Sequence, residues 1–273
     1  MANATTDRIE LFLNANHAEA ETHPVADGTA LVFSRRCPDK ESPNEDAAAL
    51  IVSNSGSAVL AVADGFGGQP AGEQASRIAL ESLTESVKEA LSAGDTLRTG
   101  ILDGFERANE AINAMGVGAA TTMVAVEIDD GSVRPYHVGD SMALVVGQRG
   151  KTKLQTVSHS PVGYAVESGM LHEADALHHE DLHIVSNMLG SSEMRIEIGT
   201  HVQLRPWDTV LIASDGVFDN IPTQEVAELI RTGPLTKVAK LLAAECDQRM
   251  RNPREGQASK PDDLSFILFR LRG

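Results

Sequence analysis

The sequence predicts an α+β fold in which antiparallel sheets are covered by helices on their outer faces. Two observations carry this prediction. Short apolar runs follow one another with turn residues between them, and two pairs of longer segments repeat their apolar positions at helical spacing. Strands and helices do not alternate one by one, so a parallel sheet of βαβ units is not expected. No internal repeat or long linker divides the chain, which predicts one domain over residues 1–273.

The first part of the chain supplies strands and one helix pair. Residues 1–28 are mostly polar, and an edge strand is expected within them at 9–13. Further strands are expected at 30–33, 48–52 and 57–63. Helical spacing then predicts helices over 70–92 and 96–114, which Gly94 separates into an antiparallel pair.

The second part begins with four strands in succession. They are expected at "TTMVAVEI" (121–128), "VRPYHV" (133–138), "MALVVG" (142–147) and "KLQTV" (153–157). Asp130-Gly131 and Arg149-Gly150 fit hairpin turns between them. After an irregular stretch, the predicted elements are strands at 195–204 and 208–214, two helices within 222–250 that break at Gly233-Pro234, and a last strand at 263–271.

The composition argues against several classes of partner. The formal net charge is −16, from 39 acidic and 23 basic residues. Nucleic acid and anionic membrane surfaces repel such a chain, so neither is expected to bind it. No apolar run reaches the roughly 18 residues that a membrane-spanning helix needs, and the start of the chain lacks the pattern of a signal peptide. Two cysteines far apart fit a reduced protein, and a cytoplasmic location is expected.

Acidic residues recur where the predicted strands begin or end. Asp64 and Asp215 each end an apolar run and precede a glycine. Asp46 and Asp262 lie just before strands, and Asp140 lies between two of them. Carboxylates that met at one edge of a sheet would repel one another, and one of them would have to bind a proton. Divalent cations such as Mg²⁺ and Mn²⁺ would relieve this repulsion, because they prefer oxygen ligands.

The Asp64-Gly65 pair has a specific interpretation at such a site. Asp64 would bridge two cations, and Gly65 would offer its backbone carbonyl, because a residue without a side chain can approach a metal closely. Taken alone, each aspartate is more often a cap or a turn residue. Two separate Asp-Gly pairs that each follow a buried strand favour the cation site.

Seven stretches of the chain, over about residues 30–271, form an ordered set of motifs. They are "NEDAA" (44–48), "VADGFGG" (62–68) with "AGEQAS" (71–76), "ATTMVAV" (120–126), "HVGDSMALVV" (137–146), "SHSPVGYAVESGML" (158–171), "DTVLIASDGVFDNI" (208–221) and "PDDLSFILFRL" (261–271). In these segments and in their order, the chain resembles the metal-dependent serine/threonine protein phosphatases of the type 2C (PPM) family, in their bacterial form. The resemblance implies a four-layer α–β–β–α sandwich of two antiparallel sheets flanked by helix pairs. Residues 1–28 would then be an N-terminal extension, and residues 158–195 a flap and variable region.

The resemblance also implies hydrolysis of phosphoserine and phosphothreonine in proteins. Asp64 matches the bridging metal ligand, Gly65 the carbonyl ligand, and Asp215 and Asp262 the ligands of the first metal. Two Mn²⁺ or Mg²⁺ ions would hold a water that loses a proton near neutral pH and attacks phosphorus in line. Asp64, Asp215 and Glu45 are therefore the expected catalytic residues, and no protein nucleophile is needed.

Four further acids complete the implied site. Glu45 and Asp46 match the acidic pair beside the second metal, which acts mainly through bound water. Asp140 and Asp219 match positions that hold a third, weaker metal in bacterial relatives. By analogy with the family, the expected partners are a phosphorylated protein substrate and a cognate serine/threonine kinase in a signalling role.

The segment before Glu45 departs from the family. Bacterial relatives commonly carry an arginine that grips the substrate phosphate three residues before the Asn of "NED", and Glu41 stands there in this chain. A carboxylate would repel phosphate, so Lys40, Arg35 or Arg36 is expected to supply the missing positive charge.

Two alternatives to an active phosphatase remain open in the sequence. Loss of the arginine would also suit a binding or signalling module that keeps the metal acids but turns over little substrate. In addition, "HEDLH" (179–183) matches the H-E-x-x-H pattern, in which two histidines on a helix bind zinc and Glu180 acts as the base of a metalloprotease. No G-x-x-H extension follows, because the third residue after His183 is Ser186, and Glu193 or Glu197 would have to supply the third ligand.

Overall fold

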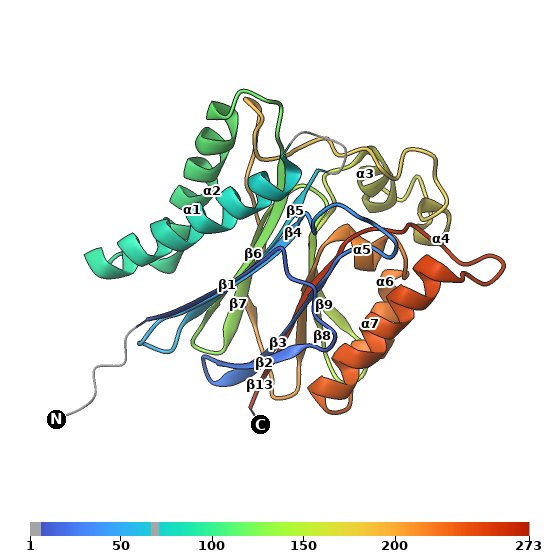
Figure 1. Cartoon of the computed structure of the whole chain (residues 1–273). Helices are drawn as coiled ribbons and strands as arrows, with labels where there is room; N and C mark the ends of the chain where they lie inside the picture. Colours follow the sequence, from blue (N-terminus) through green and yellow to red (C-terminus); the bar gives the residue numbers. More distant parts are fainter. Residues whose placement is uncertain (1–6, 67–70, 273) are drawn as a thin grey trace.

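Two antiparallel sheets form the centre of the molecule (Figure 1). The structure is a computed structural model that describes residues 7–66 and 71–272. The first sheet has the order β1-β4-β5-β6-β7-β10, and β11 also pairs with β7. Its strands are β1 (Arg8–Leu13), β4 (Asp46–Val52), β5 (Ala58–Gly65), β6 (Thr121–Asp129), β7 (Ser132–Val138), β10 (Glu197–Ile198) and β11 (Val202–Gln203).

The second sheet faces the first and has the order β2-β3-β13-β12-β8-β9. Its strands are β2 (Glu21–Val25), β3 (Gly28–Arg35), β8 (Met142–Val146), β9 (Thr152–Gln155), β12 (Thr209–Ala213) and β13 (Leu264–Leu271). The last strand of the chain therefore pairs in the middle of the sheet, between β3 and β12, and brings the residues just before it beside the end of β12.

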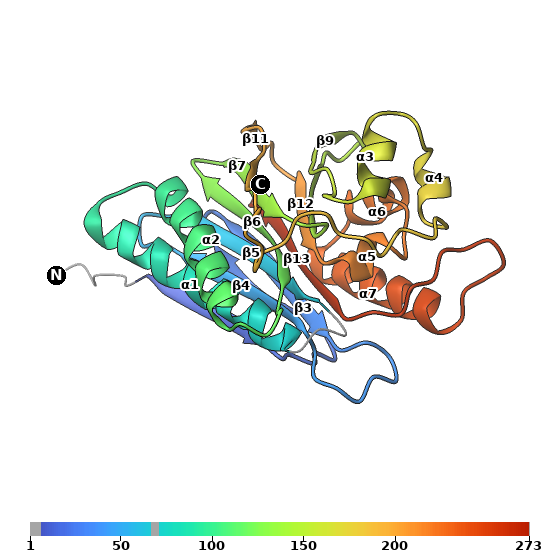
Figure 2. The ribbon, with the colours of Figure 1, turned by 90° about the horizontal axis from the view of Figure 1, so that it is seen from above.

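Helices cover the outer face of each sheet (Figures 1 and 2). The helices α1 (Gly72–Ala93) and α2 (Leu97–Ala114) pack on the first sheet, and α6 (Thr223–Ile230) and α7 (Leu235–Arg251) pack on the second. Three shorter helices, α3 (Pro161–Glu167), α4 (Glu173–Ala176) and α5 (Asp215–Phe218), lie near one end of the second sheet. The predicted α+β fold with four α–β–β–α layers is confirmed.

Burial on both faces explains why the central strands have continuous apolar runs. In β5, Leu60 and Val62 point into the interior between the sheets, whereas Val59 and Ala61 belong to the cluster under α1 and α2. Both sets are fully buried. Because successive side chains of a strand point to opposite faces, a strand covered on both sides carries no polar alternation.

The predicted strand at 195–204 is wrong as a single element. It is divided into β10 and β11, which pair with different parts of β7. Gly199 donates its N–H to the carbonyl of Pro135 in β7 at 2.8 Å. Proline has no N–H to donate in return, so the ladder is interrupted at this point.

The strand β2 was not predicted, because it is an edge strand of polar residues that includes Pro24. Together β1 and β2 place residues 8–25 on an edge of each sheet. The described part of segment 1–28 is therefore built into both sheets, and residues 1–6 lie outside the described residues.

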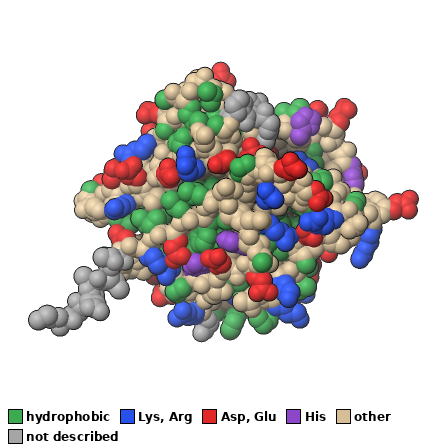
Figure 3. All heavy atoms as spheres, viewed as in Figure 1, with side chains coloured by type: hydrophobic (Ala, Val, Ile, Leu, Met, Phe, Trp, Pro, Cys, Tyr) green, Lys and Arg blue, Asp and Glu red, His purple; other side chains and the backbone are tan. Residues whose placement is uncertain are grey.

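The surface carries both signs of charge. On the face seen in Figure 3, acidic and basic side chains intermix without a region of one sign. Across residues 7–66 and 71–272, none of the helices combines the length and apolarity that a membrane crossing requires.

Candidate metal centre

Asp46 and Asp64 lie opposite each other on neighbouring strands of the first sheet. Asp46 begins β4 and pairs in register with Asp64 near the end of β5. Both have the same strand parity as Leu50 and Val62, whose side chains fill the interior between the sheets. The two carboxylates therefore face the second sheet rather than the helices α1 and α2.

The second sheet brings Asp215 and Asp262 to the same end of the molecule. Asp215 follows β12 as the first residue of α5, and Asp262 lies just before β13, the strand that pairs with β12. A hydrogen bond joins the two sheets here, because the hydroxyl of Ser214 donates to Oδ2 of Asp46 at 2.8 Å. The other oxygen of the Asp46 carboxylate, Oδ1, is buried and has no partner within the described part of the chain.

One turn of helix adds Asp219 to this group. Asp219 lies four residues after Asp215, and its N–H donates to the Asp215 carbonyl at 2.8 Å. Residues at this spacing share a helix face. Gly216 permits α5 to pack against the start of β13, because a Cβ at this position would lie 2.0 Å from the carbonyl oxygen of Asp263.

Gly65 is required by close packing around Glu45. A Cβ on Gly65 would lie 2.3 Å from the carbonyl oxygen of Gly72 and 2.8 Å from that of Glu45. A Cβ on Gly72 would lie 2.6 Å from Oε1 of the Glu45 side chain. Two glycines therefore make the room in which Glu45 approaches the end of β5. Gly67 and Gly68, which follow in the same motif, lie outside the described residues.

The electrostatics of the cluster favour a bound cation. Burial, and then neighbouring carboxylates, raise the pKa values of Asp46, Asp64 and Asp219 well above the ordinary range of aspartate. The same two causes raise the pKa values of Asp140 and Asp262 to about 7, with Asp215 as the main charged neighbour of both. Repulsion between buried carboxylates and the unpartnered oxygen of Asp46 fit hard divalent cations, which take oxygen ligands.

Two lysines lie within the acidic cluster. The ammonium of Lys40 donates to Oε2 of Glu45 at 2.6 Å and to Oδ2 of Asp263 at 2.8 Å. The ammonium of Lys260 donates to Asp215, and to Oδ2 of Asp219 at 2.7 Å. Lys260 was not identified from the sequence. Its only signal there is its place two residues before Asp262.

The other two bases proposed for phosphate binding are engaged elsewhere. Arg35 donates to Asp247 of α7 at 3.1 Å and lies over the Phe33 ring, on the side of the second sheet that α7 covers. Arg36 donates to the backbone carbonyl of Glu41 at 3.3 Å. Of the three bases, Lys40 is the one that the structure brings to the acids.

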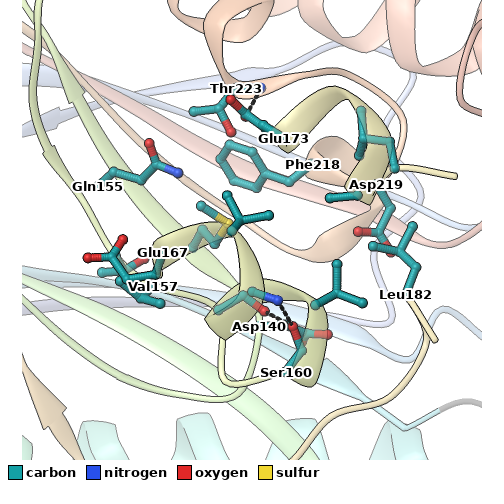
Figure 4. Close-up of a pocket in the computed structure, with 18 residues that line it drawn as sticks. Asp140, Gln155, Val157, Ser160, Glu167, Glu173, Leu182, Phe218, Asp219 and Thr223 are labelled. Carbon is teal, nitrogen blue, oxygen red and sulfur yellow. Dashed lines mark hydrogen bonds between the residues drawn. The ribbon is translucent and has the colours of Figure 1, made fainter. Parts of the chain in front are cut away.

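A pocket of about 320 Å³ adjoins the cluster (Figure 4). Asp140 and Asp219 line it, together with residues of α3 and α4. The N-cap Ser160 fixes the start of α3 by accepting from the N–H of Gly163 at 2.9 Å, and Glu173 of α4 accepts from the N–H of Thr223 at 2.8 Å. The segment predicted to be a flap therefore forms one wall of a cavity beside the candidate metal ligands.

The H-E-x-x-H segment does not have the geometry of a zinc site. His179 and His183 lie in turns that follow α4, not on a helix, so they do not share a helix face. The ring nitrogen Nδ1 of His179 accepts from the backbone N–H of Asp181 at 3.1 Å. The metalloprotease alternative has no support in these residues.

Three other residues, His137, His159 and Glu197, bring their ligand atoms within 4.8 Å of one another, which no other such group does in residues 7–66 and 71–272. The carboxylates of the acidic cluster are thus spread more widely than the ligands of one closed site. Nδ1 of His159 accepts from the backbone N–H of Gly139 at 3.1 Å, so Nε2 carries the proton and donates to Glu197 at 3.0 Å. A metal ion on Nε2 would need that proton on Nδ1, where the N–H of Gly139 already points. These three residues are therefore interpreted as a structural hydrogen-bonded group and not as a metal site.

Comparison with known proteins agrees with the geometry. A family model described as "Protein phosphatase 2C" matches residues 35–251. The serine/threonine phosphatase stp of Listeria welshimeri is 29% identical over 198 residues, which cover 69% of this chain and 78% of that protein.

Solved structures share the fold. The phosphatase Stp1 from Staphylococcus aureus has a TM-score of 0.75 at 22% identity, and the match covers 95% of this chain and 99% of that one. The catalytic domain of the phosphatase PstP, solved in complex with 2 manganese ions, has a TM-score of 0.68 at 22% identity and covers 89% of this chain and 98% of its own. Because the family model matches most of its residues, the chain belongs to the protein phosphatase 2C family, the metal-dependent serine/threonine protein phosphatases.

Proposed function

We propose that this protein hydrolyses phosphoserine and phosphothreonine in other proteins at a centre of two Mn²⁺ or Mg²⁺ ions held between its two sheets. The observation that carries the proposal is the meeting of Asp46 and Asp64 with Asp215 and Asp262 across the sheets, tied by the Ser214 hydrogen bond to Asp46. The related phosphatase that was solved with 2 manganese ions supports the choice of metal.

The chain supplies oxygen ligands and positions them. When bound, the ions supply an activated water and neutralise charge on the phosphate. Asp64 would serve both ions, the backbone carbonyl of Gly65 would be a further ligand, and Asp215 and Asp262 would hold the first ion. Asp46 and Glu45 would serve the second, and the unpartnered Oδ1 of Asp46 is an acceptor already free for a cation or its water.

Lys40 is the best-placed group to contact the phosphate. Its ammonium has three donor hydrogens, of which Glu45 and Asp263 accept two. The third can be offered to a phosphate oxygen beside the carboxylates. Asp263 holds this position firmly, because its 3% exposed side chain also accepts from the backbone N–H groups of Cys37 and Glu45, both at 2.7 Å.

The proposed substrate is a phosphorylated protein, and a cognate serine/threonine kinase would be the natural source of it. We infer that residues 1–273 act as one phosphatase domain. Residues 158–195 would contact the substrate around its phosphorylated residue, because α3 and α4 line the pocket that opens beside Asp140 and Asp219.

A binding module with little turnover is the second candidate. It is favoured by the engagement of Lys40 with two carboxylates and by Glu41 in the place of an arginine. Such a protein would bind a phosphopeptide but release its phosphate slowly.

Phosphate release from a phosphothreonine peptide separates the two candidates. The protein is first stripped with a chelator and then assayed over a range of Mn²⁺ concentrations. Turnover that appears with Mn²⁺ and disappears again with excess chelator supports the enzyme. Binding of the same peptide, measured by fluorescence anisotropy, without release at saturating Mn²⁺ would support the binding module and contradict the proposed activity.

A further inference from the structure

The Lys260 ammonium lies among three carboxylates of the acidic cluster. It donates to Asp215, and to Oδ2 of Asp219 at 2.7 Å, and lies 3.6 Å from Oδ2 of Asp262. The ammonium thus makes two hydrogen bonds and has a third carboxylate within ion-pair distance.

Two hydrogen bonds with one side chain hold the backbone of Lys260 in place. Oδ1 of Asn220 accepts from the Lys260 N–H at 2.8 Å, and Nδ2 of Asn220 donates to the Lys260 carbonyl, also at 2.8 Å. Asn220 is fully buried, and its own carbonyl accepts from the buried guanidinium of Arg249 at 2.9 Å. Because Asn220 directly follows Asp219, the same turn of chain presents the carboxylate and fixes the lysine that pairs with it.

The Lys260 ammonium and a divalent cation would compete for the same carboxylate oxygens of Asp215 and Asp219. An ammonium between Asp215 and Asp219 neutralises part of their charge and occupies the space between them. A metal ion there would have to displace a side chain whose backbone is clamped. The first metal is not excluded in this way, because Lys260 pairs with Oδ2 of Asp215 and leaves Oδ1 of that carboxylate for a cation. Asp46 and Asp64 form no ion pair with Lys260 and also remain available to cations.

We propose that Lys260 is a tethered cation of the metal centre, which takes the place that a further divalent ion would otherwise occupy at Asp219. The centre then holds two divalent ions and one ammonium, and Asp219 pairs with Lys260 instead of binding metal. This inference rests on the proposed metal centre, but it concerns the number of ions bound and does not depend on turnover.

The test counts Mn²⁺ ions bound per chain by equilibrium dialysis and elemental analysis, without substrate. We expect two ions in the wild type and three in Lys260→Met, which removes the charge but keeps a long side chain. The third ion should bind more weakly than the first two. Lys260→Arg, which keeps the charge, should bind two ions like the wild type.

Lys153→Met is the matched control. Lys153 also donates to a buried aspartate, Asp208, but does so outside the acidic cluster. Losing this ion pair should leave the count at two ions. A third ion in Lys153→Met would show that loss of any lysine charge adds binding, and would overturn the inference.

A second variant keeps the inference testable if Lys260→Met does not fold. Asp219→Asn should bind two ions, the same number as the wild type, because Asp219 would not be a metal ligand. Three ions in the wild type, or one ion fewer in Asp219→Asn than in the wild type, would contradict the role given to Lys260. So would an unchanged count of two in folded Lys260→Met.

The same counts keep this inference separate from the proposed function. Two ions in both the wild type and Lys260→Met would leave the metal centre standing and remove only the tethered cation. No bound Mn²⁺ in any variant would instead contradict the metal centre itself, and with it the inference that rests on it.

Discussion

The two lysines of the acidic cluster occupy different surroundings. Lys260 is surrounded by Asp215, Asp219 and Asp262, and its backbone is clamped by Asn220. Lys40 has two carboxylate partners, and it belongs to the connection between β3 and β4, which is mostly exposed or half-buried.

The difference shows that lysine side chains can have two different roles within one acidic cluster. Lys260, with three carboxylates around its ammonium and its backbone held by Asn220, acts as a counter-ion for the protein. Lys40, with two carboxylate partners, can still offer its third donor to an anionic substrate. The number of carboxylates around each ammonium separates the two roles.

The largest loss of activity is expected from a change in the metal centre that both lysines adjoin. Asp64→Asn takes a charged ligand from the end of β5 and should lower kcat/KM by more than about a hundredfold, as loss of a preorganised electrostatic contact typically does. The variant should be assayed at saturating Mn²⁺ on a phosphothreonine peptide. Turnover close to wild type would mean that neither lysine borders the reacting centre.

The second-largest loss of kcat/KM should distinguish Lys40 from the other proposed phosphate-binding bases, Arg35 and Arg36. Lys40→Ala should lower kcat/KM by roughly ten- to hundredfold, because loss of a charge-assisted contact to phosphate costs about 1.5–3 kcal/mol. Arg35→Ala is the control. Because Arg35 pairs with Asp247 of α7, this variant should keep nearly normal kcat/KM. An equal loss in both variants would point to damage in the β3–β4 connection instead of lost phosphate binding.

The smallest effect should be an increase in kcat/KM when residue 41 is changed. Glu41 is exposed, and Glu41→Arg would replace repulsion of phosphate by an attractive, bidentate donor. We expect kcat/KM to rise by up to about tenfold, which corresponds to about 1.4 kcal/mol. Glu41→Gln, which removes the charge without adding a donor, should gain less. If neither variant gains, residue 41 does not reach the phosphate.

Much of this architecture could be predicted from the sequence. The apolar runs around Leu60 and Leu211 identified central strands, because burial on both faces leaves only apolar residues. Asp64 and Asp215 stood out because each ends such a run before a glycine. The register of β4 with β5 then places Asp46 beside Asp64 without any further signal.

The contacts of Lys260 could not be predicted in this way. Its partner Asp219 lies 41 residues earlier in the chain, and no periodic pattern relates the two. Their contact depends on α5 and on the Asn220 clamp, and a four-residue helix leaves almost no periodic signal. Lys40, Arg35 and Arg36 lie within six residues of Glu41, whereas Lys260 lies near the other end of the chain.

Carboxylates of the two sheets should hold two metal ions beside Lys260. An anomalous difference map from crystals of the protein grown with Mn²⁺ tests this directly. We expect two manganese peaks, both within ligand distance of Asp64, and no peak between Asp219 and Lys260. A map with no manganese at the Asp64 carboxylate would contradict it.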